Sequence, residues 1–277
     1  MRVFVVAVAL SATMMSVGGC GLVSKDSSSK GSGQPGPQAS AKASESAAPA
    51  YLGKPKVGEC HALTVKDIRR DSETKKPVPC SEPHTTVTVA VVKATKATSS
   101  AKGDARTFAV GEACGPGFTK ALGADSKTRA KTLYSLAWFN PTKEQVADGA
   151  TWLRCDVTLT AANHAFAIKG EQPLLDDGPT KAELACGRLA GGEKAAWIFV
   201  PCATKHQFVL TDLIAAAPGT SYTDAEKAAK KACLLKGGLY SWSHADQWGI
   251  GDRWYSCWES TEPIEQDPGV LALGKLG

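Results

Sequence analysis

Apolar and polar residues alternate along two stretches in the first half of the chain, as in half-buried β-strands. In residues 85–92 valine occupies positions 87, 89 and 91 on one face, and Thr86, Thr88 and Ala90 lie on the other. Residues 151–159 follow an Asp-Gly turn signal and alternate in the same way. This alternation places Cys155 on the apolar side of the strand. Residues 133–139 form a further strand candidate. These patterns predict an antiparallel sheet.

One helical pattern lies between the first two of these strands. Cys114, Phe118 and Leu122 are spaced four residues apart, which places them on one face of a helix with Asp104 as its N-cap. Pro116 stands between two glycines inside the pattern. We therefore expect this helix to be broken or to begin near Pro116. A helical Cys114 and a strand Cys155 that both face inward can meet.

The second half of the chain contains the same kinds of element in the same order. A capping box at 223–226 opens a helix whose Ala225, Ala229 and Cys233 share one stripe. Residues 249–252 are predicted to form a turn. The strand candidates are residues 197–200, 208–214, 239–242 and 253–259.

A short motif occurs once in each half. Val78-Pro79-Cys80 is followed by His84, and Val200-Pro201-Cys202 is followed by His206 at the same spacing. This repetition predicts an α+β protein of two tandem small disulfide-stapled domains, each an antiparallel sheet with one helix. The predicted segments are a signal peptide at 1–20, a disordered tether at 21–56, the first domain at 57–162, a linker at 163–180, the second domain at 181–262 and a flexible tail at 263–277.

The N-terminus has the pattern of a lipoprotein precursor. One positive charge precedes an apolar run that is too short to span a bilayer, as in a secretory signal peptide. Val17-Gly18-Gly19-Cys20 resembles the bacterial lipobox, in which the cysteine thiol receives a diacylglyceryl group. A plain secreted protein is the alternative. We therefore expect an anchor to membrane lipid through acylated Cys20 and a location on the extracytoplasmic face of the cell membrane.

Composition narrows the set of partners. The net charge of +5 is spread along the 277 residues, which argues against nucleic acid as a partner. Weak attraction to anionic lipid or wall polymers fits better, and envelope or division proteins are the other candidate partners.

The number of cysteines predicts disulfide bonds. Nine cysteines minus Cys20 leave eight, which divide evenly between the halves. Even within separate halves several pairings remain open, and each bond would contribute roughly 3–4 kcal/mol in the chain-entropy model. The pairs that we prefer are Cys60–Cys80, Cys114–Cys155, Cys186–Cys202 and Cys233–Cys257.

Metal binding is the rival interpretation of the repeated motif. Cys80 with His84, and Cys202 with His206, could each donate two zinc ligands, but zinc needs two more. Exported proteins with even cysteine numbers more often form disulfides. We therefore interpret His84 and His206 as structural hydrogen-bonding residues and predict no metal or cofactor.

Catalysis has little support in the sequence. A cysteine–histidine hydrolase needs an unpaired thiol, whereas each of the eight cysteines has a counterpart in the other half, and no Gly-x-Ser-x-Gly elbow is present. An exposed aromatic surface for sugar or peptide is possible, although core packing is the commoner role of tryptophan on an alternating strand. The tryptophans concerned are Trp152, Trp197, Trp242, Trp248, Trp254 and Trp258.

The motifs resemble the septum-formation-related domain of actinobacterial membrane proteins and lipoproteins, in two tandem copies. In the first half the resemblance is carried by Val57-Gly58-Glu59-Cys60, Val78-Pro79-Cys80-Ser81-Glu82-Pro83-His84, Cys114 with Phe118, and Trp152 to Cys155. In the second half it is carried by Val200-Pro201-Cys202, His206, Cys233 and the run from Gly251-Asp252-Arg253 to Cys257. The first half departs from the pattern at 148–150, where Asp-Gly-Ala replaces Gly-Asp-Arg, and the second half lacks Ser-Glu-Pro before its histidine.

The resemblance implies a role near division or envelope growth and supplies no catalytic residues. The sequence therefore predicts a non-enzymatic binding or scaffolding module at the cell envelope. A cell-envelope hydrolase that uses a cysteine or a metal is the alternative, and a ligand-delivery lipoprotein with one deep apolar pocket is a third possibility.

Overall fold

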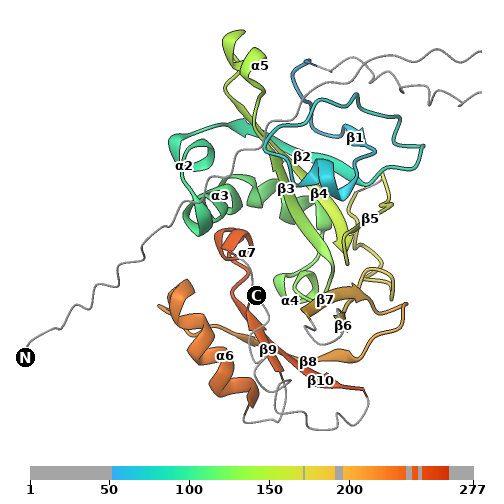
Figure 1. The fold of residues 1–277 in the computed structure, drawn as a ribbon, viewed down its shortest axis with the longest axis vertical. Coiled ribbons are helices and arrows are strands. Elements are labelled where there is room, and N and C mark those ends of the chain that lie inside the picture. The colour runs from blue at the N-terminus through green and yellow to red at the C-terminus, as the bar shows by residue number, and fades with distance from the viewer. Residues whose placement is uncertain (1–51, 171, 191–195, 235–238, 243–244, 262–277) are drawn as a thin grey trace, which may run out of the picture. The chain divides into compact units, whose positions relative to one another are not determined.

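Two antiparallel sheets and the helices packed on them form the fold (Figure 1). The computed structural model describes residues 52–170, 172–190, 196–234, 239–242 and 245–261. The predicted signal peptide, Cys20, the tether up to residue 51 and the predicted tail lie outside these residues. The elements in chain order are β1 (Cys60–His61), α1 (Val65–Ile68), β2 (Thr86–Lys93), α2 (Lys96–Ser99), α3 (Gly103–Leu122), α4 (Ser126–Arg129), β3 (Tyr134–Phe139), α5 (Lys143–Ala147), β4 (Trp152–Ala161), β5 (His164–Phe166), β6 (Ala185–Ala190), β7 (Ala196–Pro201), β8 (Phe208–Ala215), the short helix η2 (Tyr222–Asp224), α6 (Ala225–Leu234), β9 (Leu239–Trp242), α7 (Ala245–Ile250) and β10 (Trp254–Ser260).

The first sheet has the strand order β1-β2-β4-β3, with β5 paired to β4. Its strands β2, β3 and β4 are those that the alternation predicts. The buried side chains of Cys114, Phe118 and Leu122 confirm the predicted apolar face of α3.

The predicted break in α3 is wrong, because the helix runs from Gly103 to Leu122 with Pro116 inside it. The flanking glycines allow close packing instead of a break. A Cβ atom at Gly115 would lie 3.3 Å from Ile250, and one at Gly117 would lie 2.7 Å from the carbonyl oxygen of Val89. The helix also begins one residue before the expected N-cap, Asp104.

The predicted faces of β2 are wrong after Val89, because the strand has a β-bulge at that residue. Thr88 lies opposite Asp156, but the next paired residue is Ala90, opposite Cys155. The extra residue reverses the alternation, so Val91 lies opposite Arg154 on the outer face rather than with the other valines.

The second sheet has the order β7-β6-β8-β10-β9, and α6 packs against β9 and β10 (Figure 1). Ala225, Ala229 and Cys233 are fully buried, which confirms the predicted stripe of α6. The turn predicted at 249–252 begins inside a helix, because α7 ends at Ile250. Strand β6 has no counterpart among the predicted strands.

The two sheets share several features. The eight cysteines form the four pairs preferred from the sequence, Cys60–Cys80, Cys114–Cys155, Cys186–Cys202 and Cys233–Cys257. The order β1-β2-β4-β3 has its parallel in β6-β8-β10-β9. Strand β8 also has its register shift at Thr211, between residues paired to Trp258 and Cys257, as β2 has at Val89.

The two sheets belong to one compact unit and contact each other directly. Helices α3 and α7 touch through glycines, because a Cβ atom at Gly111 or at Gly249 would overlap the backbone of the other helix. Arg129 of α4 donates to both carboxylate oxygens of Asp252, at 3.1 Å and 2.6 Å. Burial raises the pKa of this carboxyl group, and the guanidinium of Arg129 opposes that shift.

The segment predicted as a linker packs on the first sheet. It contains the whole of β5, and Leu174 and Leu175 are buried. Their N–H groups donate to the carbonyl oxygens of Ala121 and Leu122 at the end of α3. These bonds satisfy carbonyls that the end of a helix leaves without a partner.

Candidate functional site

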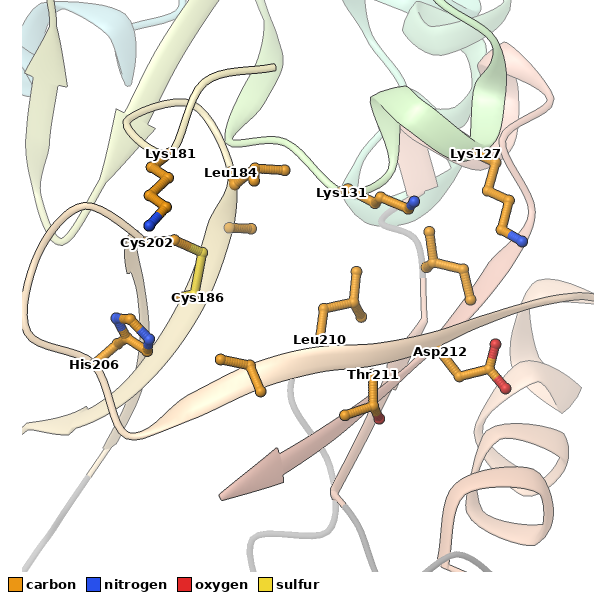
Figure 2. Close-up of a pocket in the computed structure, with 13 residues that line it drawn as sticks. Lys127, Lys131, Lys181, Leu184, Cys186, Cys202, His206, Leu210, Thr211 and Asp212 are labelled. Carbon is orange, nitrogen blue, oxygen red and sulfur yellow. A yellow bond between two sulfur atoms is a disulfide. The ribbon is translucent and has the colours of Figure 1, made fainter. Parts of the chain in front are cut away.

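A cleft of about 500 Å³ lies between β6 and β8 of the second sheet (Figure 2). In Figure 2 the lysines lie along one side, β8 crosses the opposite side, and His206 and a disulfide lie at one end. The lining residues are Lys127, Lys131, Lys181, Leu184, Ala185, Cys186, Cys202, His206, Val209, Leu210, Thr211, Asp212 and Leu213.

The cleft exists because β6 separates from β8 toward its own start. Among the described residues, Gly187 and Phe208 are the single pair that joins these two strands. Before that pair, the N–H of Ala185 donates to the carbonyl oxygen of Lys131 at 2.9 Å. Leu184 forms a bridge with Thr132. The backbone at the start of β6 is therefore bonded to the segment between α4 and β3 instead of to β8.

Lysine side chains lie on one side of the cleft, and apolar side chains of β8 form its floor on the opposite side. Lys127, Lys131 and Lys181 are exposed, and none of the three forms an ion pair with a described residue. Val209, Leu210 and Leu213 of β8 supply apolar side chains below them. Such a surface suits a ligand that combines negative charge with apolar groups, because each part then meets its complement.

His206 and His84 have the same local contact. Nδ1 of His206 lies 2.8 Å from the carbonyl oxygen of Thr204, and Nδ1 of His84 lies 2.8 Å from that of Glu82. Because a carbonyl oxygen can only accept, Nδ1 carries the proton and donates in both cases. Their surroundings differ, since His84 is 2% exposed whereas His206 is half-buried and lines the cleft.

Two alternative interpretations, a zinc site at the repeated motif and a cysteine hydrolase, need cysteines with a free thiolate. Cys80 and Cys202 are both in disulfides, so neither can ligate zinc beside its histidine. The described residues contain no group of three His, Cys, Asp or Glu side chains that could hold a metal ion. All eight cysteines from Cys60 to Cys257 are paired, so none offers a nucleophilic thiol.

The tryptophans are divided between the core and half-buried positions. Trp152, Trp248 and Trp258 are buried. Trp197 and Trp254 are half-buried, and the side chain of Trp242 lies outside what the structure describes. Ring centroids of Trp197 lie 4.8 Å from Phe208 and 5.5 Å from Trp258. These contacts are those of core packing.

Sequence reasoning missed a cluster of buried charges on the outer face of the first sheet. Arg154 lies 3.1 Å from Glu73 and 3.0 Å from Asp156, both measured between side-chain N and O atoms. Asp156 accepts hydrogen bonds from Thr86 at 3.0 Å and Thr88 at 2.9 Å. The signal in the sequence was the pair of opposite charges at alternate positions of the predicted strand.

His61 belongs to the same cluster. Its Nδ1 lies 4.0 Å from Glu73, and burial together with the nearby Arg154 guanidinium lowers its pKa to about 4. The ring is 1% exposed and is therefore neutral at physiological pH. The charged cluster is closed to solvent and serves the structure rather than a ligand.

Comparison with known proteins identifies the family. The family model described as septum formation matches residues 101–240, which is half of the chain. The chain belongs to the septum formation family. The match contains every residue that lines the cleft, whereas motif residues at 57–60, 78–84 and 251–257 lie outside it. It is one family domain, and a second tandem copy remains a prediction. Neither a curated protein nor a solved structure matches the chain.

Two further findings concern where this septum formation protein resides. Four disulfides indicate an extracytoplasmic location, because such bonds persist in oxidising compartments. In the part of the chain that the structure describes, no helix has the length and apolarity needed to cross a membrane.

Proposed function

We propose that this protein is a lipid-anchored, non-enzymatic binding module on the extracytoplasmic face of the cell membrane, and that the cleft between β6 and β8 is its binding site. One observation carries this assignment. Three exposed lysines without ion pairs to the described residues stand above an apolar floor, where a ligand could satisfy both. Paired cysteines support binding over cysteine chemistry.

The proposal includes two related domains. The two sheets agree in strand order, in disulfide positions and in the place of the bulge. We propose that a duplication produced both sheets and that only the second has kept, or acquired, an open cleft. The family supports a partner in septum formation.

The lipid anchor can be tested through Cys20. The Cys20→Ala variant should leave the membrane fraction, and mass spectrometry of the wild-type N-terminal peptide should show a diacylglyceryl group on Cys20. Substitution of Ser27 to alanine is the matched control and should leave the protein in the membrane. An unmodified Cys20 in the membrane fraction would rule out this mode of attachment.

The cleft can be tested by lysine footprinting. An amine-acylating reagent is applied to envelope membranes that contain the full-length protein and to the same protein after purification. Lys127, Lys131 and Lys181 should be less reactive in the envelope, because a bound partner covers them. Lys66, Lys96 and Lys102, on α1, α2 and before α3, are exposed controls and should react equally in both samples. Equal reactivity of the cleft lysines would contradict binding at this site.

A further inference from the structure

One edge of β8 lines the cleft, and among the described strands only β6 pairs with it, at a single residue. β10 pairs with the opposite edge of β8 over its whole length, from Phe208 to Ala215. The residue that pairs with β6 is Phe208. Open strand edges bind extended peptides by adding them to the sheet as a further strand.

The first sheet shows how a strand occupies the corresponding edge. There Thr88 of β2 accepts from the N–H of Gly58 and donates to the carbonyl oxygen of Glu59, both at 2.8 Å. Leu210 occupies the position of Thr88, since each lies just before the bulge of its strand. We therefore expect the N–H and C=O of Leu210 to face the cleft, where β6 does not reach them.

The size and chemistry of the cleft fit a short peptide. The edge of β8 from Val209 to Leu213 is about 17 Å long at 3.4 Å per residue, which is enough for five or six extended residues. The lining contains three lysines against one carboxylate, Asp212. An alternating peptide can place apolar side chains on Leu210 and Leu213 and acidic side chains toward the lysines. A lipid headgroup would satisfy the lysines but leave the backbone of β8 unused.

The geometry points to an extended acidic peptide segment of a partner protein, which pairs with β8 at Leu210 and places its carboxylates against Lys127, Lys131 and Lys181. This inference rests on the proposed function, which assigns the cleft as a binding site. The partner is then recognised by strand addition rather than by charge alone.

Binding of synthetic peptides to the full-length protein in detergent tests the inference. The probe is a seven-residue peptide that alternates glutamate and valine, followed by fluorescence anisotropy. Two analogues carry N-methyl groups on the valine amides or on the glutamate amides, which removes the donors of one strand edge and keeps the charge. At least one analogue should bind about tenfold more weakly. Unchanged binding of both analogues would overturn strand addition.

Variants of the protein test the charge requirement. The triple variant K127Q/K131Q/K181Q should bind the parent peptide about tenfold more weakly, because three exposed ion pairs each contribute a factor of about two. The control K66Q/K96Q/K102Q removes the same charge outside the cleft and should bind normally. An equal loss in both variants would contradict the assignment of these lysines.

Binding tests with two other ligands show whether a failure concerns strand addition alone or the proposed function as well. Binding of inorganic phosphate or of a soluble short-chain phosphatidylglycerol without binding of the peptide would overturn strand addition and leave the cleft as an anion site. If none of the three ligands binds, the proposed function fails as well. Binding of a lysine–valine peptide as tightly as the acidic one would also overturn the preference for acidic segments.

Discussion

The first sheet has buried polar residues at three positions where the second sheet has glycine or a largely apolar residue. The three positions in the first sheet are His61, Thr88 and Asp156, and the corresponding ones in the second are Gly187, Leu210 and Trp258. The strand order and cross-links around them are the same. One framework therefore accepts two different layers on its outer face.

The nature of the layer determines whether the sheet is open. Buried charges must be covered and hydrogen-bonded, and Glu73 from the segment after α1 closes over Arg154 in the first sheet. An indole ring carries no charge, so its N–H is the one group that needs a partner; that of Trp258 donates to Ser241 at 3.1 Å, and Trp197 packs directly on Gly187 in the second. With no polar layer to enclose, the start of β6 can leave β8 and open the cleft.

The largest expected effect comes from breaking the charged layer. Asp156→Ala should lower the free energy of unfolding by about 3–5 kcal/mol, because it leaves two threonine hydroxyls without their buried acceptor and leaves Arg154 with Glu73 as its one carboxylate partner. Urea denaturation followed by tryptophan fluorescence measures the loss. The control Asp148→Ala removes an exposed carboxylate outside the layer and should cost about 1 kcal/mol or less. Similar losses in the two variants would contradict a special role for the layer.

In the second sheet the corresponding change is steric. A Cβ atom at Gly187 would overlap the ring of Trp197, so Gly187→Ala should cost about 3 kcal/mol, near the upper end for overpacking. The double variant G187A/W197L makes room for the methyl group. It should be more stable than G187A alone if the overlap is the cause, and less stable if the aromatic packing matters more.

Acid should affect the first sheet through His61. Its folded pKa of about 4 lies below the unfolded value of 6.5, so the unfolded state binds the proton first and protonation favours unfolding. Stability is therefore present above pH 6.5 and falls as the pH drops toward 4. Between pH 7 and pH 5 the loss should be about 2 kcal/mol by the linkage relation.

The His61→Gln variant provides the comparison for this pH dependence. It should lose less stability than the wild type between these two pH values, because glutamine does not titrate, while Glu73 and Asp156 remain in both proteins. A parallel loss in both proteins would assign the effect to other groups. The second sheet has Gly187 at this position, which has no group that titrates.

Much of the framework could be predicted from the sequence. Strands β2, β3 and β4 follow from alternation, whereas β1, β5 and β6 were not predicted, and the Cys114–Cys155 disulfide follows from the inward faces of its two cysteines. The bulges at Val89 and Thr211 could not be predicted, because one extra residue leaves the composition of a strand unchanged. The continuity of α3 was missed because its glycines serve contacts with distant residues.

The candidate site depends on contacts between residues that are far apart in the sequence, and no local sequence pattern predicts such contacts. Its lysines are separated along the chain and come together because Ala185 bonds to Lys131. The motif histidine His206 was found from the sequence, but the one difference in the motif, the absence of Ser-Glu-Pro before it, does not predict its open position. Likewise, the polar face of β4 gave no sign that Glu73 would cover it.

The smallest expected effect separates the two motif histidines. His84→Ala should cost about 2 kcal/mol, because the ring is buried and a Cβ atom at Gly170 would lie 3.4 Å from its Cε1, so its removal leaves a cavity and an unpaired carbonyl oxygen. His206→Ala should cost about 1 kcal/mol or less, because water can replace the ring at the cleft. Urea denaturation of both variants measures the difference. Equal losses would mean that the two motifs are enclosed alike, which the open cleft does not allow.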